Sequence, residues 1–308
     1  MHVVHGHRNA AGWDRAAIAI GNFDGVHVGH RALLAQARAL AARHAARTVA
    51  LTFDPHPSTL FAPARAPAML TSLARRLELF EEAGVDAVVV EPFTRELADI
   101  PAPAFLDDIV LGALRAQAIV VGYNFSYGQG RVGNIDSLRA HAGALGVEVA
   151  IVPPVTVDGE LASSTRIRAH LRAGELTWVE RMLGRRWDVD GVVVHGAKRG
   201  RTIGVPTANV RPDLELAIAP GIYAVTLAVD GGPALPAVAS LGTNPTFVDQ
   251  GGLVLEVHVL DWAGDIYDRR VRTTFVARLR DELKFSSVDA LIAQIRQDIA
   301  DARPLLAR

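Results

Sequence analysis

The sequence predicts an α/β protein of two domains, in which a parallel-sheet domain precedes an antiparallel β-barrel with a terminal helix. In the first part of the 308-residue chain, apolar strand-like runs alternate with helix-like stretches, which is typical of a parallel sheet covered on both faces. From Trp187 onward, the strand-like segments alternate residue by residue between Gly, Pro and Asp turns, which favours a small barrel. The pattern changes after Gly184, so we place the domains at residues 1–184 and 185–308.

The expected strands of the first domain are short apolar runs, namely Ile18–Ile20, Thr48–Phe53, Ala87–Val90, Ala118–Val121 and Val147–Val152. A helix is expected over Ser72–Ala83, because apolar residues recur there at helical spacing, at Leu73, Leu77 and Phe80. Gly84 directly follows this stretch and is expected to end the helix.

The expected strands of the second domain show the alternation of half-buried strands, and they are Asp188–His195, Ile222–Val229, Ala237–Leu241, Val254–Leu260 and Val271–Leu279. A final helix is expected to pack on the barrel through one apolar face, formed by Val288, Leu291, Ile292, Ile295 and Ile299.

Composition excludes several classes of protein. The net charge of −1 provides no general attraction to nucleic acid or to an anionic membrane, and the chain has no cysteine for disulfides or thiolate sites. No apolar stretch is long enough to cross a bilayer, and the first residues do not resemble a signal peptide. We therefore expect a cytoplasmic protein with no nucleic-acid or membrane partner, and a homo-oligomer is possible. The histidines at positions 2, 5 and 7 suit a metal less well than a disordered or edge-strand start.

The most informative segment is His27-Val28-Gly29-His30, which lies between the apolar run 16–20 and a helix-like stretch. The first turn of a helix offers unpaired N–H groups and the positive end of the helix dipole, so it binds anions. Gly29 allows close approach to a phosphate, to which both imidazoles can donate hydrogen bonds. A loop with two surface histidines is the alternative, but the upstream Gly21, Asp24 and Gly25 favour the phosphate site.

Three further segments follow expected strands or open a helix of the first domain: Thr52–Pro57, Val121–Gly128 and Ser163–Arg168. Open α/β sheets bind ligands at the carboxyl ends of their strands. Hydroxyls, N-terminal amides and guanidinium groups together suit a polyphosphate. Each segment alone has a plain explanation as a turn, a cap or surface charge, but their convergence predicts a nucleotide site.

In the second domain, the densest motif is Gly204-Val205-Pro206-Thr207-Ala208-Asn209. Thr207 and Asn209 are two positions apart in extended chain, so their oxygens point to the same side and can hold a Mg²⁺ that also binds phosphates. A turn begun by Pro206, with an Asx cap, is the alternative reading. The basic loop Gly196–Arg201 lacks P-loop spacing and fits a solvated surface as well as a phosphate contact.

Glu256 lies in an otherwise apolar strand-like segment, Leu255-Glu256-Val257-His258. A carboxylate that faces the interior is costly unless it is paired or functional. Facing outward, it would be an ordinary polar position, and the alternation with Leu255 and Val257 permits this. The residues alone leave both readings open.

Gly21–His30 resembles the signature of the HxGH nucleotidyltransferase superfamily. With the other segments and the second domain, the chain resembles the bacterial bifunctional riboflavin kinase/FMN adenylyltransferases, or FAD synthetases, from about residue 14 to residue 303. The resemblance implies a Rossmann-like N-terminal domain and a six-stranded C-terminal barrel. It also implies ATP as co-substrate, Mg²⁺ as cofactor, and riboflavin and FMN as substrates.

By this resemblance, His27 and His30 hold the ATP phosphates, and Arg166 clamps the departing pyrophosphate. The other implied contacts are those to ATP, from Asn22, Phe23, Asp24, Ser164 and Thr165, and those to the flavin, from Asn124, Phe125 and Tyr127. The family often has Asp at position 124 and Phe at position 127, which leaves the polar contact at Asn124 open.

In the second domain, the resemblance implies that Glu256 is the general base for the ribityl 5′-hydroxyl and that Thr207 and Asn209 hold the metal. Asn244–Phe247 and Arg278–Phe285 also resemble family segments near the flavin. The chain departs from the family at Arg186, where Pro is common, and at Asp268, where Gly is common.

Two other functions remain as alternatives. The first is a nucleotidyltransferase of another specificity, for example for a pantetheine or nicotinate nucleotide, with an attached binding barrel. The second is an OB-like nucleic-acid module in the barrel, which the near-neutral charge and the few aromatic residues disfavour. The presence of both HVGH and PTAN in one chain favours the two-site flavin enzyme.

Overall fold

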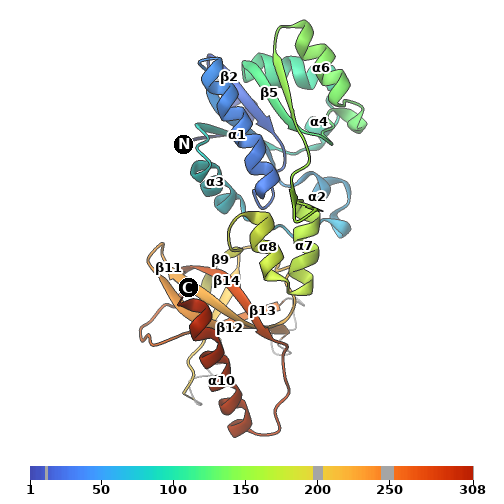
Figure 1. The fold of residues 1–308 in the computed structure, drawn as a ribbon. Helices are drawn as coiled ribbons and strands as arrows, with labels where there is room; N and C mark the ends of the chain where they lie inside the picture. Colours follow the sequence, from blue (N-terminus) through green and yellow to red (C-terminus); the bar gives the residue numbers. More distant parts are fainter. Residues whose placement is uncertain (11–12, 197–203, 244–252, 308) are drawn as a thin grey trace. The chain divides into compact units, whose positions relative to one another are not determined.

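The computed structural model describes residues 1–10, 13–196, 204–243 and 253–307, which form two compact units (Figure 1). Unit 1 comprises Met1–Pro67 and Leu73–Ser163, and unit 2 comprises Ala68–Ser72 and Ser164–Arg308. The short segment 68–72 belongs to unit 2 because Trp187 Nε1 donates to the Leu70 carbonyl at 2.9 Å. The predicted boundary at residue 184 stays a prediction.

Unit 1 is built on a six-stranded parallel sheet with the strand order β1-β4-β3-β2-β5-β6. Its strands are β1 (His2–His5), β2 (Ala16–Ile20), β3 (Arg47–Asp54), β4 (Ala87–Pro92), β5 (Ala116–Gly122) and β6 (Glu148–Val152). All five predicted strands are confirmed. The sixth strand, β1, stands first in this order and pairs only with β4, so it is an edge strand. This confirms the prediction of an edge strand for the histidine-rich start.

Helices cover both faces of this sheet. The helical segments of unit 1 are η1 (His7–Asn9), α1 (Val28–Arg43), α2 (Pro57–Phe61), η2 (Pro63–Arg65), α3 (Leu73–Glu82), α4 (Arg95–Ala98), α5 (Ala102–Ala104), the π-helix η3 (Phe105–Ala113), η4 (Gln129–Arg131) and α6 (Ile135–Ala144). Helices α1 and α3 pack on one face. Segments α5, η3 and α6 pack on the other.

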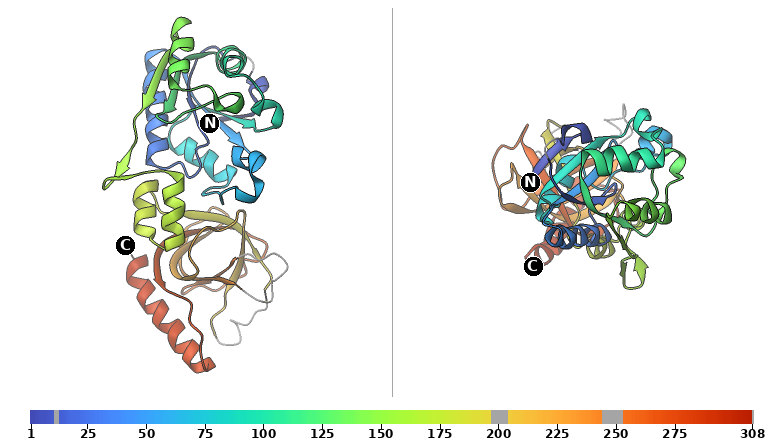
Figure 2. Two further views of the ribbon diagram at one scale, coloured as in Figure 1. Left: turned by 90° about the vertical axis from the view of Figure 1, so that its right-hand side faces the viewer. Right: turned by 90° about the horizontal axis from the view of Figure 1, so that it is seen from above.

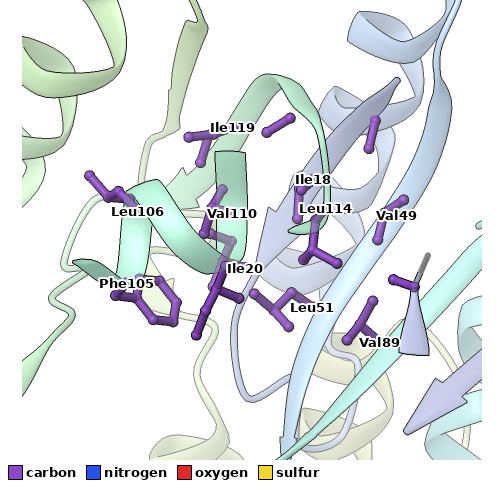
Figure 3. Close-up of a cluster of buried hydrophobic side chains, with 14 of the residues drawn as sticks. Ile18, Ile20, Val49, Leu51, Val89, Phe105, Leu106, Val110, Leu114 and Ile119 are labelled. Carbon is purple, nitrogen blue, oxygen red and sulfur yellow. The ribbon is translucent and has the colours of Figure 1, made fainter. Parts of the chain in front are cut away.

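The core of unit 1 follows from the alternation of side chains along the buried strands. On β2, Ile18 and Ile20 point into the cluster beneath η3, whereas Ala17 and Ala19 face α1. Figure 3 shows the first cluster, in which branched side chains from neighbouring strands meet those of η3. Full burial of each such side chain stabilises the fold by roughly 1.5–3 kcal/mol. Because all six strands are parallel, their carboxyl ends lie along the same edge of the sheet.

Unit 2 contains a closed barrel of six antiparallel strands in the order β10-β13-β12-β11-β14-β9. Its strands are β9 (Asp188–Val194), β10 (Ala208–Pro212), β11 (Gly221–Val229), β12 (Ala234–Thr243), β13 (Leu253–Val259) and β14 (Arg270–Arg280). The five predicted strands are confirmed. Strand β10 was not predicted as a strand, because its apolar alternation is limited to Ala208 and Val210 before Pro212.

Helices α7 (Ser164–Ala173), α8 (Leu176–Leu183) and α10 (Val288–Leu306) belong to the same unit, and a small hairpin of β7 (Thr156–Val157) and β8 (Glu160–Leu161) precedes α7. The terminal helix α10 packs beside the barrel on β11, β12 and β14, as predicted (Figure 2). One member of its predicted apolar face is wrong: Val288 is 57% exposed. It is the first residue of the helix, and the fully buried positions lie farther along, at Asp298 and Ala302.

Within the described residues, none of the helices has the length and apolarity that crossing a membrane requires.

Candidate active sites

The loop after β2 places His27 at the start of α1, where it is the N-cap residue. Its Nδ1 accepts the backbone N–H of His30 at 3.3 Å. Since Nδ1 is the acceptor, a neutral His27 ring carries its proton on Nε2 and can donate it. Gly29 leaves room for this ring, because a Cβ there would lie 3.0 Å from His27 Cε1 and would press against it.

The two imidazoles of the motif are stacked, with ring centroids 3.6 Å apart and an interplanar angle of 21°. The ring of Phe23 supports them. It makes edge contacts with the rings of His30 and Phe80, with ring centroids 5.2 Å apart in both pairs. The Phe23 side chain is fully buried. Its contact with ATP stays a prediction. Because the side chain is buried, only the main chain of Phe23 is available for that contact in this conformation.

Burial determines the charge of both histidines. It lowers the pKa of His27 to about 4. The pKa of His30 also falls well below its usual value, first through burial and then through the proximity of His27 and Arg76. Both rings are therefore neutral at pH 7, and they can bind phosphate as hydrogen-bond donors rather than as cations.

A buried cation lies next to this pair. Arg76 of α3 is 1% exposed and donates to the Asn22 carbonyl at 2.7 Å and to Asp54 Oδ1 at 3.2 Å. Asp24, which is also buried, and Asp54 both favour the charged guanidinium, whereas burial lowers its pKa. Arg76 therefore compensates the charge of these carboxylates, and the N-terminus of α1 adds its positive dipole end.

The predicted segment Thr52–Pro57, at the end of β3, contacts Asn22 of the loop after β2. Asn22 Nδ2 lies 3.2 Å from His56 Nε2, and Thr52 Oγ1 donates to the Asn22 carbonyl at 3.2 Å. His56 is in turn the N-cap of α2, where its Nδ1 lies 2.6 Å from Ser58 Oγ. The loops that follow β2 and β3 thus form one connected polar site.

The predicted flavin residues follow β5 and differ in exposure. Asn124 is exposed and Phe125 is half-buried. Tyr127 is buried in the core, stacked on Phe125 at 5.5 Å, and its hydroxyl lies 3.2 Å from Ser137 Oγ. Asn124 and Phe125 are accessible to a ligand. A flavin contact of Tyr127 stays a prediction.

The predicted pyrophosphate clamp belongs to unit 2, because Ser164, Thr165 and Arg166 form the first turn of α7. Thr165 and Arg166 are exposed there. Their roles stay predictions.

The second candidate site lies on the outer face of the barrel. Across the antiparallel strands, Asn209 of β10 pairs with Glu256 of β13, which in turn pairs with Ser240 of β12. All three are half-buried, whereas the alternate residues Leu255 and Val257 fill the barrel interior. The outward reading of Glu256 is thus correct for its orientation, and the strand pairing gives it polar neighbours.

Thr207 completes this group, because its Oγ1 donates to Glu256 Oε2 at 3.4 Å. His258 Nδ1 donates to the Pro206 carbonyl at 2.7 Å and so ties the turn before Thr207 to β13. A Cβ at Gly196 would lie 2.1 Å from Asn209 Nδ2, so only glycine leaves room for that amide.

The donor atoms of this site fit Mg²⁺. Thr207, directly before β10, and Asn209, within it, supply a hydroxyl and an amide oxygen next to the Glu256 carboxylate. Magnesium prefers oxygen ligands and usually takes few of them from the protein. Two predicted segments, most of the basic loop Gly196–Arg201 and all of Asn244–Phe247, lie outside the described residues.

Sequence reasoning missed two side chains. Arg76 has a recognisable signal, because it occupies an i+3 position within the apolar stripe of Leu73, Leu77 and Phe80, where a charge is unexpected. His258 has no comparable signal, since its partner Pro206 is 52 residues away in the sequence.

Comparison with known families assigns both units. The model of the FAD synthetase family matches residues 10–166, and that of the riboflavin kinase family matches residues 183–306. The crystal structure of a macrolide-efflux protein from Streptococcus pneumoniae is similar over 98% of this chain and 99% of its own, with a TM-score of 0.86 and 30% identity.

Curated relatives match the whole length of the chain. The bifunctional riboflavin kinase/FMN adenylyltransferase of Pseudomonas fluorescens is 40% identical over 100% of this chain and 98% of its own. The protein of that name from Escherichia coli K12 is 37% identical over 98% of this chain and 97% of its own. The predicted resemblance is confirmed: the chain belongs to the family of bifunctional riboflavin kinase/FMN adenylyltransferases.

Proposed function

We propose that the chain makes FAD from riboflavin in two ATP-dependent steps, with the kinase step in unit 2 and the adenylyl transfer in unit 1. The observation that carries this proposal is the presence of two polar sites in one chain of this family. One is the histidine pair at the N-terminus of α1, and the other is the Thr207–Asn209–Glu256 group on the barrel.

In the kinase step, the ribityl 5′-hydroxyl of riboflavin attacks the γ-phosphorus of ATP. A new O–P bond forms, the bond to the β-phosphate oxygen breaks, and ADP leaves. Glu256 accepts the hydroxyl proton as general base. Mg²⁺ held by Thr207 and Asn209 would neutralise charge on the ATP phosphates. The hydrogen bond from Thr207 supports this role, because it orients the Glu256 carboxylate.

In the adenylyl transfer, a phosphate oxygen of FMN attacks the α-phosphorus of a second ATP, and pyrophosphate leaves. The attacking oxygen is already ionised, so no general base is needed. Neutral His27 and His30 donate hydrogen bonds to the phosphates, and the N–H groups of the first turn of α1 add to them. Catalysis then rests on alignment and on charge stabilisation rather than on a covalent intermediate.

The remaining predicted residues fill the parts of this site that the chemistry requires. Asn22 and Asp24 are proposed to border the ATP site, and Phe23 to contact ATP through its main chain. Ser164, Thr165 and Arg166 are proposed to bind the departing pyrophosphate. Their hydroxyls and guanidinium match an anion with several oxygens.

The proposed flavin contacts are those of Asn124, Phe125 and Tyr127. The accessible positions of Asn124 and Phe125 at the carboxyl end of β5 support them. We expect both reactions to use Mg²⁺ and to take place in the cytoplasm, where ATP is available.

Separation of flavins by chromatography tests the proposal. Purified protein is incubated with riboflavin, ATP and Mg²⁺, and we expect FMN to appear first and FAD to follow. A parallel incubation with FMN in place of riboflavin isolates the second step. Folded protein that forms neither product would contradict the proposal, and FMN without FAD would restrict it to unit 2.

A further inference from the structure

The residue that carries a further inference is Arg76, whose guanidinium connects two loops of the adenylyl-transfer site. Its Nη1 donates to the Asn22 carbonyl at 2.7 Å, to Thr52 Oγ1 at 3.3 Å and to the Phe53 carbonyl at 3.4 Å, and its Nη2 donates to Asp54 at 3.2 Å. Asn22 follows β2, and the other acceptors are the last residues of β3. One side chain of α3 thus fixes the spacing of the two strand ends.

Packing alone does not explain a charge at this position. The apolar stripe of α3 would accommodate an aliphatic residue, whereas a buried guanidinium loses several kcal/mol of hydration that its partners must offset. Burial accordingly lowers the pKa of Arg76, and Asp54 and Asp24 act in the opposite direction. A cation retained at such a cost indicates a role for the charge and its hydrogen bonds.

The loop that Arg76 holds is strained. Phe23 and Val26 have positive φ values of 52° and 41°, a conformation that L residues rarely adopt. Such strain persists only where the surroundings enforce it, and it concentrates at functional sites. The shortest Arg76 bond is to the carbonyl of Asn22, which belongs to the peptide unit that leads into Phe23. Phe23 in turn supports the ring of His30.

From this connection, we propose that Arg76 is a positioning residue for adenylyl transfer. It holds the loop from Gly21 to Asp24 in the conformation that places His30, and its charge compensates the carboxylates of Asp54 and Asp24, which would otherwise repel phosphate. The inference rests on the adenylyl transfer proposed for unit 1. It assigns Arg76 no direct contact with the reacting atoms.

The test compares Arg76→Met and Arg76→Lys with the unchanged chain. Methionine retains the length of the side chain but removes the charge and the donors, and lysine retains the charge with a single nitrogen. Arg75→Met is the control on the same helix, because it also removes a buried cation, but one that forms ion pairs with Glu78 and Glu82 of α3, whereas Arg76 holds the loop of Asn22. Riboflavin phosphorylation by unit 2 of each variant serves as the internal reference.

We expect Arg76→Met to reduce kcat for FAD formation on the order of 100-fold and to raise KM for ATP, since misplaced catalytic groups have effects of this size. For Arg76→Lys we expect a reduced kcat with a nearly unchanged KM for ATP, because the charge remains while the link between the loops is lost. FMN formation and the Arg75→Met control should match the unchanged chain. The raised KM of Arg76→Met would not arise from a loss of folded protein, which lowers only the apparent kcat. The kcat of Arg76→Lys is therefore corrected for the folded fraction measured in thermal melts.

Three outcomes would overturn the inference. The first is an Arg76→Met variant with normal FAD formation, and the second is a loss of activity that only follows the folded fraction in thermal melts. The third outcome applies if Arg76→Met does not fold, and it is a folded Arg76→Lys variant with an unchanged kcat for FAD formation. Should the unchanged chain itself form no FAD from FMN, the proposed function fails instead.

Discussion

At the scale of single residues, burial decides what the histidines of unit 1 can do. His27 and His30 are neutral at pH 7, so their part is to donate hydrogen bonds. The buried cation beside them is Arg76, whose guanidinium stays ionised and compensates the carboxylates of Asp54 and Asp24. The sequence shows the two imidazoles and the glycine between them, but their low pKa values follow from the surrounding core.

We predict that His30→Ala abolishes FAD formation and leaves FMN formation unchanged, because the ring belongs to the site of unit 1 alone. Removal of one such donor typically costs a factor on the order of 100–1,000 in kcat. Chromatography of flavins measures both products in one incubation. A folded His30→Ala protein that has lost both activities would contradict the assignment of two sites.

Glu256→Gln should have the opposite effect. The amide keeps the size of the side chain and can still accept from Thr207, but it cannot take the proton of the 5′-hydroxyl. We expect FMN formation to fall by roughly 100–10,000-fold, the usual contribution of a general base. FAD formation from added FMN should remain normal, and its loss would argue against the separation of sites.

Acid should destabilise unit 1 through His27. The pKa of this residue is lowered by burial to about 4, whereas an unfolded histidine titrates near 6.5. Between these values the unfolded state binds more protons, so the free energy of unfolding falls as pH decreases. The loss amounts to about 3 kcal/mol between pH 6.5 and pH 4. Urea unfolding at several pH values measures it, and His27→Asn should flatten the dependence.

At the scale of elements, a buried ion pair fixes the terminal helix α10. Asp298 is 4% exposed and accepts from Arg280 Nε at 2.7 Å and Nη2 at 2.6 Å. Gln294 donates to the same carboxylate at 3.0 Å. A pair that is buried and hydrogen-bonded in this way holds the helix against the end of β14, whereas half-buried apolar residues supply the rest of the contact.

We predict that Asp298→Ala destabilises unit 2 by about 3–5 kcal/mol, because it leaves the Arg280 guanidinium without its carboxylate. The matched control is the exposed pair that Arg303 of the same helix forms with Asp261, which lies after β13. Asp261→Ala removes a bridge between two solvated charges and should leave stability almost unchanged. Thermal melts of both variants measure the difference, and equal effects would show that burial does not matter.

The elements most predictable from sequence are those that bury a clear pattern. The five predicted strands of the sheet and the five of the barrel are confirmed, because their apolar periods match the buried faces. Strand β10 was not predicted, because its apolar pattern is short and the strand is stabilised by pairing with β9 and β13. Val288 was assigned to the apolar face of α10 by spacing, but the helix meets the barrel beyond its first turn.

At the scale of the whole molecule, the histidine pair and the Thr207–Asn209–Glu256 group lie in separate compact units. This separation predicts complementation between inactive variants. His30→Ala should convert riboflavin to FMN, and Glu256→Gln should convert FMN to FAD, so a mixture of the two should form FAD from riboflavin. We expect neither variant to do so alone. Time courses of the mixture measure the transfer of FMN from the first variant to the second. If two folded variants fail to complement each other, FMN is not released into solution between the two steps.

The apolar periods of the sequence predicted the fold class, and its motifs predicted the family and, through it, the two reactions. Only the tertiary structure decided how distant residues meet. The pairing of β10 with β13 places Glu256 beside Asn209, and α3 brings Arg76 beneath the loop of Asn22. These contacts depend on strand register and on the burial of charge, which are properties of the packed molecule rather than of any single segment.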